Sequence, residues 1–256
     1  MLFHEPQNIP SIGGKLSMKK MTIMTALLGL TIGASTALAT TYALPGKGVV
    51  LSKHDMNQLP EAGTMTGRDS QGRVCAFCHT PHHKLESNAL DYNPLWSHQI
   101  NIDTNFIAYD SVTFDSNLAS GDPLVGPSRL CMSCHDGSIA VDQHYGMAGN
   151  ATRSGDTWNE IAIGKNSDLS NDHPIGFSLV GINDRDKGIR ATLQSANNPL
   201  LMNAVPITYL GYKDVNGDSI MTCASCHDVH NKDNVDTAFL YEQQSGSQFC
   251  LMCHDK

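Results

Sequence analysis

The sequence predicts a domain made mostly of coil, with short helices at four cysteine-containing loops and a few short strands. No long apolar stripe with the period of an α-helix runs along the chain. The stretches 84–130 and 137–222 hold many Gly, Pro, Asn, Asp and Ser residues, which favour turns and irregular structure. The eight cysteines fall into four closely spaced pairs. We expect one domain rather than two.

The first 39 residues are expected to be absent from the mature protein. Residues 18–20 begin a short basic segment, residues 21–34 are apolar and uncharged, and Ala37-Leu38-Ala39 has the small residues of a cleavage site. This layout predicts a secretory signal peptide over 18–39, with an uncleaved anchor as the alternative. Residues 1–17 have no signal character, and we interpret them as a mis-called N-terminal extension.

The mature segment, 40–256, is acidic. It carries 14 Lys and Arg against 24 Asp and Glu, so its formal charge is −10. Such a surface argues against binding to nucleic acid or to anionic membranes. No later segment is apolar enough to insert into a bilayer. We therefore expect an exported, soluble protein without nucleic acid partners and without membrane insertion.

Each cysteine pair is followed at once by histidine, in the form C-x-x-C-H. Two cysteines three residues apart lie about one helical turn from each other, so both sulfurs can bond to one edge of a porphyrin while the histidine binds its iron. This is the signature of covalent haem attachment. A redox C-x-x-C or half of a zinc site is the alternative. Since 12 of 256 residues are histidine, four chance histidines at this place have odds on the order of one in 10⁵.

The sequence therefore predicts four covalently bound haem c groups and a multihaem cytochrome c fold in which the haems form the core. The expected thioether-forming residues are Cys75, Cys78, Cys131, Cys134, Cys223, Cys226, Cys250 and Cys253. The expected proximal iron ligands are His79, His135, His227 and His254.

The second axial ligands must come from elsewhere in the chain. Seven mature histidines lie outside the motifs, namely His54, His82, His83, His98, His144, His173 and His230. Seven candidates for four positions favour two histidines on each iron, with methionine as the rival ligand that would raise the potential. Four irons with two histidines each leave no open position for a substrate. We therefore expect an electron carrier and not an enzyme.

The motifs repeat in pairs. The run Cys75–His82 matches Cys223–His230, and each is followed later by a second motif that runs straight into aspartate. This predicts two two-haem units, 75–136 and 223–255. His82 and His230 each stand three residues after a proximal histidine, too close to reach the far side of the same ring. Each can reach a neighbouring haem, and a surface histidine is the alternative.

Further short elements accompany the motifs: Lys53-His54-Asp55, Cys78-His79-Thr80-Pro81-His82-His83, Asn93–Trp96, Cys134–Gly137, Asn171–Gly176 and the terminal Cys253-His254-Asp255. Over most of 50–256, the pattern resembles the OmcE-like outer-surface tetrahaem cytochromes of metal-reducing bacteria. The resemblance implies His54, His82, His173 and His230 as distal ligands. It leaves His98 as the leading reserve, ahead of His83 and His144.

The same resemblance implies a function outside the cell. It predicts a secreted chain that polymerises with itself into an extracellular filament and passes electrons from redox partner cytochromes to an external acceptor such as a metal oxide. Because His54 lies near the mature N-terminus, we interpret it as a possible ligand to a haem of the neighbouring subunit. The alternative is a monomeric periplasmic tetrahaem carrier. An oxidoreductase, the third hypothesis, would need a haem with an open position.

Outside the motifs, local signals are few. Phe106–Tyr109 and Ile207–Tyr212 are short runs with strand character. The loop Asp214–Asp218 alternates oxygen-bearing residues as a calcium loop does, but it lacks the glycine and the glutamate that such a loop needs. A hairpin turn at Asn216-Gly217 is the better prediction.

Overall fold

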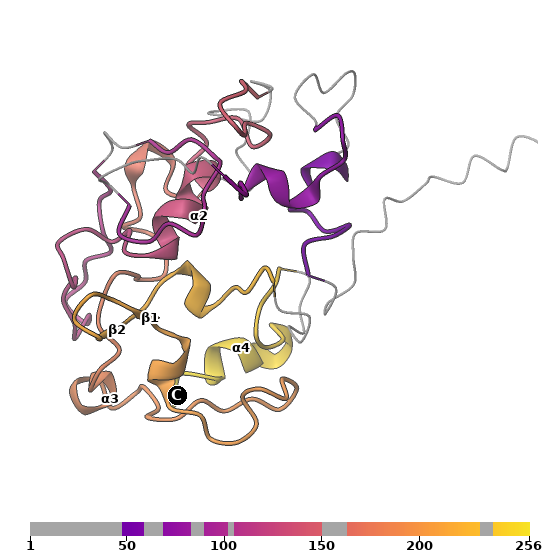
Figure 1. Cartoon of the computed structure of the whole chain (residues 1–256). Helices are drawn as coiled ribbons and strands as arrows, with labels where there is room; N and C mark the ends of the chain where they lie inside the picture. Colours follow the sequence, from indigo (N-terminus) through magenta and orange to yellow (C-terminus); the bar gives the residue numbers. More distant parts are fainter. Residues whose placement is uncertain (1–47, 59–68, 83–89, 102–104, 150–162, 231–237) are drawn as a thin grey trace, which may run out of the picture. The chain divides into compact units, whose positions relative to one another are not determined.

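The computed structural model describes residues 48–58, 69–82, 90–101, 105–149, 163–230 and 238–256 (Figure 1). All of them belong to the larger of two units, Tyr42–Lys256. The predicted extension at 1–17 and the predicted signal peptide at 18–39 lie outside the described residues. Within the described ranges, no helix combines the length and the apolar character needed to cross a membrane.

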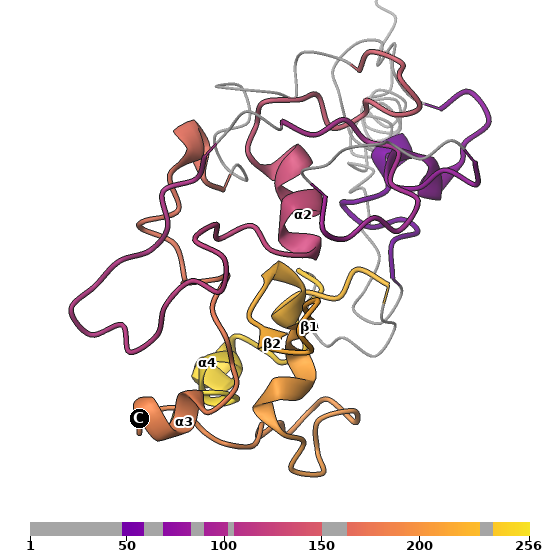
Figure 2. The same cartoon turned by 60° about the vertical axis from the view of Figure 1, so that its left-hand side comes forward.

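Regular structure is sparse, and long stretches of coil join the labelled elements (Figures 1 and 2). The α-helices are α2 (Pro127–His135), α3 (Ile182–Arg185) and α4 (Gln248–Leu251). The 3₁₀ helices are η1 (Met56–Gln58), η2 (Val74–Phe77), η5 (Lys165–Ser167), η6 (Ile207–Leu210), η7 (Cys223–Ser225) and η8 (Ser245–Ser247). The strands among the described residues are β1 (Tyr212–Lys213) and β2 (Ser219–Ile220). The prediction of a mostly coil chain with few strands is confirmed.

Each C-x-x-C-H motif starts on a short helix, as the cysteine spacing predicts: η2, α2, η7 and α4 carry the four motifs in chain order. The helix α2 begins with Pro127 at its first turn, where the missing N–H costs nothing. It ends at His135. Gly137 follows with a φ of 74°, a left-handed conformation that ends helices and that glycine adopts without steric strain because it has no Cβ.

The predicted turn at Asn216-Gly217 is present. Strands β1 and β2 pair antiparallel, with Tyr212 opposite Ile220. Gly217 has a φ of 84°, and the Asp214 carboxylate accepts the backbone N–H groups of Asn216 at 2.9 Å and Asp218 at 2.8 Å. These bonds within the loop are those of an Asx-type turn. The structure therefore accounts for Asp214 as a turn residue.

The predicted strand Ile207–Tyr212 is wrong over its first four residues, and only Tyr212 lies in a strand, β1. The predicted strand Phe106–Tyr109 is reduced to a single bridge. Ile207–Leu210 forms the 3₁₀ helix η6 directly after Pro206. Residues three apart share a face in such a helix, so Ile207 and Leu210 are both buried there. Ile107 makes one isolated parallel bridge with Asp168 and is exposed. A short apolar run alone does not distinguish these outcomes.

Buried apolar side chains of the described residues gather in separate small clusters. The largest contains Phe177, Leu179, Ile182, Leu193, Leu201, Ile207, Leu210, Met221 and Met252, with Cys226 and Cys253 packed against it. A second cluster of Met56, Phe77 and Val141 contacts Cys134. A third, made of Trp96, Ile100 and Leu130, contacts Cys78. Cysteines of all four motifs therefore lie at the edges of apolar packing.

Candidate haem-binding site

One helical turn shapes each motif. The backbone N–H of the motif histidine donates to the carbonyl of the first cysteine, at 2.8 Å for His79, 3.0 Å for His227 and 2.9 Å for His254. The second motif lies within the continuous helix α2. A turn of this kind places the two cysteines on one face with the histidine next to them. All eight cysteines lie in the described residues, and none forms a disulfide.

Burial keeps the second cysteine of each motif protonated. It raises the pKa of Cys78, Cys134 and Cys226 to about 12 and that of Cys253 to about 11. A reactive redox cysteine has the opposite property, a lowered pKa that exposes a thiolate. In the third motif, however, a hydrogen bond with Cys131 lowers the pKa of the first cysteine, Cys223, so the cysteine pKa values do not decide between haem attachment and a redox C-x-x-C.

Two proximal histidines are oriented by backbone carbonyls. The Nδ1 atom of His79 lies 2.8 Å from the Pro94 carbonyl oxygen, and the Nδ1 atom of His227 lies 2.7 Å from that of Ala238. A carbonyl oxygen only accepts, so we assign the proton to Nδ1 in both rings. The lone pair of each ring is then on Nε2. A hydrogen bond from Nδ1 to a carbonyl is how metal-binding histidines are commonly oriented, because it leaves Nε2 free to bind the metal.

The supporting loops of these two motifs are equivalent in detail. The N–H of Thr80 donates to the Leu95 carbonyl at 2.8 Å, and that of Asp228 donates to the Phe239 carbonyl at 2.9 Å. Leu95 and Phe239 have φ values of 59° and 60°, in the left-handed region that non-glycine residues seldom adopt. The first and third motifs therefore share a local geometry that extends beyond their matching sequences.

Three ring contacts in the described part of the chain join a motif histidine to a predicted distal one. The centroid distances are 5.9 Å for His79–His230, 5.9 Å for His135–His54 and 6.3 Å for His254–His173. Two imidazoles that share one metal at about 2 Å from each Nε2 have centroids roughly 6 Å apart. The centroid distances of the three pairs are therefore compatible with one iron between the two rings of each pair.

The fourth combination is not assembled in the same way. His82 and His227 are both exposed, and in the described residues they are not in ring contact. The Thr80 hydroxyl donates to the His82 carbonyl, which holds His82 in a tight turn after its motif.

His54 combines burial with an unused ring nitrogen. Burial, together with the neighbouring charges of His135 and His227, lowers its pKa to about 4. The Phe239 ring stacks on it at 5.0 Å, and its Nδ1 atom is buried without a hydrogen-bond partner. A neutral imidazole is the form that binds metal. His54 lies against His135 of its own chain, with their ring centroids 5.9 Å apart.

The reserve histidines lie in different settings. The ring of His98 is buried, with Nδ1 2.8 Å from the Gln99 carbonyl oxygen and Nε2 3.1 Å from that of Ala140. A neutral imidazole has one N–H, and burial lowers the pKa of His98, so the ring donates to one of these two carbonyls. His144 is also buried, and its Nδ1 atom lies 2.8 Å from the Asp142 carbonyl oxygen. His83 lies outside the described residues.

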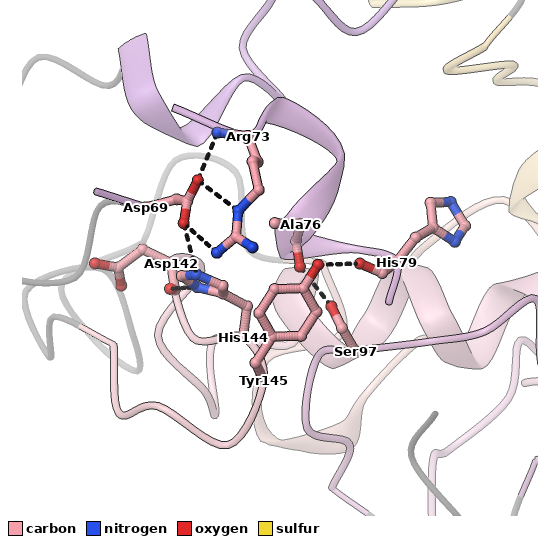
Figure 3. A network of polar contacts seen from close by, with 8 residues as sticks. All are labelled: Asp69, Arg73, Ala76, His79, Ser97, Asp142, His144 and Tyr145. Atoms are coloured by element: carbon pink, nitrogen blue, oxygen red, sulfur yellow. Dashed lines mark hydrogen bonds and ion pairs between the residues drawn. The ribbon is translucent and has the colours of Figure 1, made fainter. Parts of the chain in front are cut away.

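A polar network anchors the first motif (Figure 3). Asp69 accepts from the Arg73 side chain through both carboxylate oxygens, at 2.6 and 3.0 Å, and this bond lowers the pKa of Asp69 to about 2. The Arg73 guanidinium lies 5.3 Å from the Tyr145 ring centroid. The Tyr145 hydroxyl donates to the His79 carbonyl at 3.0 Å. These contacts fix the backbone that carries a proximal histidine.

Two buried hydrogen-bond donors near the motifs have no partner among the residues that the structure describes, so a bound haem could supply one. The Trp96 Nε1 and Asn57 Nδ2 atoms are buried and have no hydrogen-bond partner in the described part of the chain. Trp96 lies 6.0 Å from the His79 ring centroid, and Asn57 belongs to η1, close to His54 in sequence. Buried donors need acceptors. Haem carries propionate groups that accept hydrogen bonds, so each of these two separate donors fits a haem propionate beside it.

Little of this second shell could be read from the sequence. The residues that orient His79 and His227 act through main-chain carbonyls, which leave no characteristic side chain. The element Asn93–Trp96, which contributes the Pro94 carbonyl, was visible only as part of the wider pattern. Its counterpart at 238–240 has different side chains and gave no signal.

C-x-x-C-H turns whose histidines present Nε2 are the attachment sites of covalently bound haem c, and their repetition defines a multihaem c-type cytochrome, a class of proteins that generally carry electrons. Residues 214–256, which include the third and fourth motifs, match the model of the doubled CXXCH motif family. The match supports the same class. No curated protein matches the chain.

Proposed function

We propose that the chain binds four haem c groups, each held by two histidines, and that it carries electrons rather than transforming a substrate. The observation that carries this proposal is the set of three imidazole pairs at 5.9, 5.9 and 6.3 Å. Haem supplies the redox chemistry when bound. The chain holds the iron from both sides with ligands that need not move, and two imidazoles favour a low potential.

The residues proposed for this role are those that the sequence predicts. The eight motif cysteines form the thioether bonds, and the four motif histidines are the proximal ligands. His54, His173 and His230 are the distal ligands that the ring contacts support, and His82 is the fourth. His98 remains the reserve ligand, with backbone carbonyl oxygens within hydrogen-bond distance of both its ring nitrogens.

We further propose that the protein is exported and polymerises into an extracellular filament that delivers electrons to an external acceptor such as a metal oxide. The signal-like layout of residues 18–39, the acidic mature segment and the resemblance to filament-forming tetrahaem cytochromes support this. Redox partner cytochromes would feed the filament. A monomeric periplasmic carrier is the second candidate, because nothing in the imidazole pairs requires polymerisation.

Electron microscopy of two cell fractions separates these candidates. Filaments in material sheared from cells, identified by mass spectrometry as this chain, are the expected result. Monomers confined to the periplasmic extract, with none in the sheared fraction, would replace the filament by the periplasmic carrier. A His54→Ala variant that still forms normal filaments would exclude a ligand role for His54 between subunits.

A further inference from the structure

We propose that Arg190 is a positioning residue for the fourth haem: its guanidinium holds the turn that presents His254, and its positive charge raises the reduction potential of the iron bound there. The inference rests on the proposed function, since it takes His254 as a proximal ligand. It adds to that function a side chain outside the four motifs.

The segment that carries Arg190 pairs with the fourth motif through its backbone. The N–H of Asp255 donates to the carbonyl of Gly188, and the N–H of Arg190 donates to the carbonyl of Cys253, both at 2.8 Å. Cys253 and Asp255 are the two neighbours of the motif histidine in the chain. The backbone of Arg190 is therefore fixed beside the residue proposed to bind the iron.

The first motif is paired in the same way. There the N–H of Thr80 donates to the carbonyl of Leu95 at 2.8 Å, and the N–H of Ser97 donates to the carbonyl of Cys78 at 3.0 Å. Ser97 therefore occupies the place beside the first motif that Arg190 occupies beside the fourth. The two motifs differ at this place by a neutral side chain and a cation.

The side chains at these two places donate to the same carbonyl of their motifs. The Ser97 hydroxyl donates to the carbonyl of Ala76 at 2.6 Å, and the Arg190 Nε–H donates to the carbonyl of Leu251 at 3.1 Å. Ala76 and Leu251 each follow the first cysteine of their motif. Carbonyls at the end of a helical turn have no partner within it, so an outside donor stabilises the turn.

Arg190 makes two contacts that a serine cannot make. Its Nε–H also donates to the His254 carbonyl at 3.2 Å, and its Nη2 atom lies 2.8 Å from the Asp255 carboxylate. The Arg190 side chain is 21% exposed, whereas that of Asp255 is 64% exposed. The cation is therefore the more buried member of the ion pair, and it lies against the motif.

A positive charge beside a proximal ligand stabilises the reduced haem, because reduction adds one negative charge to the site. At an effective dielectric constant of about 20, a unit charge about 10 Å away changes such an equilibrium by roughly tenfold. For a one-electron couple, a tenfold change corresponds to about 59 mV. The exposed Asp255 carboxylate offsets only part of this effect, since water screens it.

A potentiometric titration followed by absorbance tests the charge. Arg190→Gln keeps a hydrogen-bond donor and loses the charge. It is expected to keep four covalent haems by intact mass and to move one quarter of the absorbance change to lower potential, by roughly tenfold in the redox equilibrium of that haem. Arg190→Lys keeps the charge and is expected to stay close to the wild-type curve. A curve unchanged by Arg190→Gln, or lowered as much by Arg190→Lys, overturns the proposal.

Arg185→Gln is the matched control. The Arg185 guanidinium also donates to backbone carbonyls, those of Asp115, Ser178 and Val180, which belong to no motif. This variant is expected to leave the titration curve unchanged. An equal shift with Arg185→Gln would reflect a general loss of positive charge and would overturn the specific role of Arg190.

A background that lacks the fourth haem identifies the haem that moves. Cys250→Ala/Cys253→Ala removes the attachment cysteines of the fourth motif. In this background, Arg190→Gln is expected to leave the three remaining contributions to the titration curve where they are. A shift that persists there assigns the effect to another haem and overturns the proposal.

Asp255→Asn keeps the test decisive if Arg190→Gln loses a haem or the cysteine variant does not fold. Asp255 is exposed, and its change leaves the Arg190 bonds to the Leu251 and His254 carbonyls in place. It is expected to raise the potential of one haem by less than tenfold, opposite in sign to Arg190→Gln, and an unchanged or lower potential overturns the proposal. The proposed function fails differently, by a wild-type protein that contains no covalent haem at all.

Discussion

His173 offers a clean test of distal ligation, because it is exposed and lies at the edge of the described fold. Its ring centroid is 6.3 Å from that of His254, and its Nδ1 atom lies 3.1 Å from the Pro174 carbonyl oxygen. The Nε2 atom is therefore the one available for an iron held by His254. Methionine has a similar reach, so a His173→Met variant is expected to keep six ligands while exchanging an imidazole for a thioether.

The expected change is a shift of one potential among four. Axial ligands set haem potentials over a span of about 0.8 V, and methionine in place of histidine raises the potential. A rise of about 0.1 V for one haem is a modest share of that span. For a one-electron couple, at about 59 mV for each tenfold change, it corresponds to roughly a 50-fold change in the redox equilibrium.

A potentiometric titration followed by absorbance measures this shift. Each of the four haems contributes one quarter of the absorbance change. In the variant, one of these contributions is expected to move to higher potential, while the covalent haem content stays the same. Asn171→Met places a methionine in the same loop, two residues away, and is expected to leave the curve unaltered. A His173→Met protein with four haems and the wild-type titration curve would refute the ligand role of His173.

Three further predictions concern the residues that hold the motifs. Arg73 lowers the pKa of Asp69 to about 2. Ionised Asp69 therefore stabilises the fold above about pH 4, and this contribution is lost as the pH falls toward 2. Asp69→Asn is expected to remove that pH dependence from the thermal unfolding curve and to lower the free energy of unfolding at pH 7 by about 1–2 kcal/mol. The buried Glu242 carboxylate accepts hydrogen bonds from the Ser195 hydroxyl at 2.5 Å and from several N–H groups. Glu242→Ala removes this acceptor, so the free energy of unfolding is expected to fall by about 3–5 kcal/mol and the Tm measured by calorimetry by about 10 °C. Tyr145→Phe removes the hydroxyl that donates to the His79 carbonyl. It is expected to lower the free energy of unfolding measured by denaturant titration by about 0.5–1.5 kcal/mol and to leave haem attachment intact.

Two of these predictions have a control variant, and each has a result that would contradict it. Asp184→Asn changes an exposed ion pair with Lys187, and it is expected to be nearly neutral; equal effects of this change and Asp69→Asn would contradict the first prediction. A Glu242→Ala protein as stable as the wild type would show that its neighbours find other acceptors. Tyr209→Phe, at an exposed tyrosine, is the control for Tyr145, and matching losses for both would refute the bond to His79.

Elements set by interactions between residues close in the sequence can be predicted from it, whereas elements set by contacts with distant residues cannot. The Cys75–His79 motif dictates its own helical turn, and Asn216-Gly217 dictates its own hairpin, because both are decided within five residues. Ile207–Leu210 is decided by the preceding Pro206 and by burial of one face against distant side chains. A run of four residues contains neither influence, so its strand character was misleading.

The candidate site divides in the same way. Cysteine spacing identifies the attachment residues, since the covalent geometry is local. The pairing of His54 with His135, and of His173 with His254, joins residues far apart in the chain. Residue types alone did not distinguish those ligands from His98, whose backbone contacts become visible only in three dimensions.

The intact mass of the purified mature protein, taken together with its absorption spectrum after acid denaturation, tests the central claim most directly. Four covalently attached haems are expected to add four haem masses to the polypeptide and to keep their spectrum with the denatured chain. A mass equal to that of the amino acids alone, with no haem absorption left on the polypeptide, would contradict the whole account.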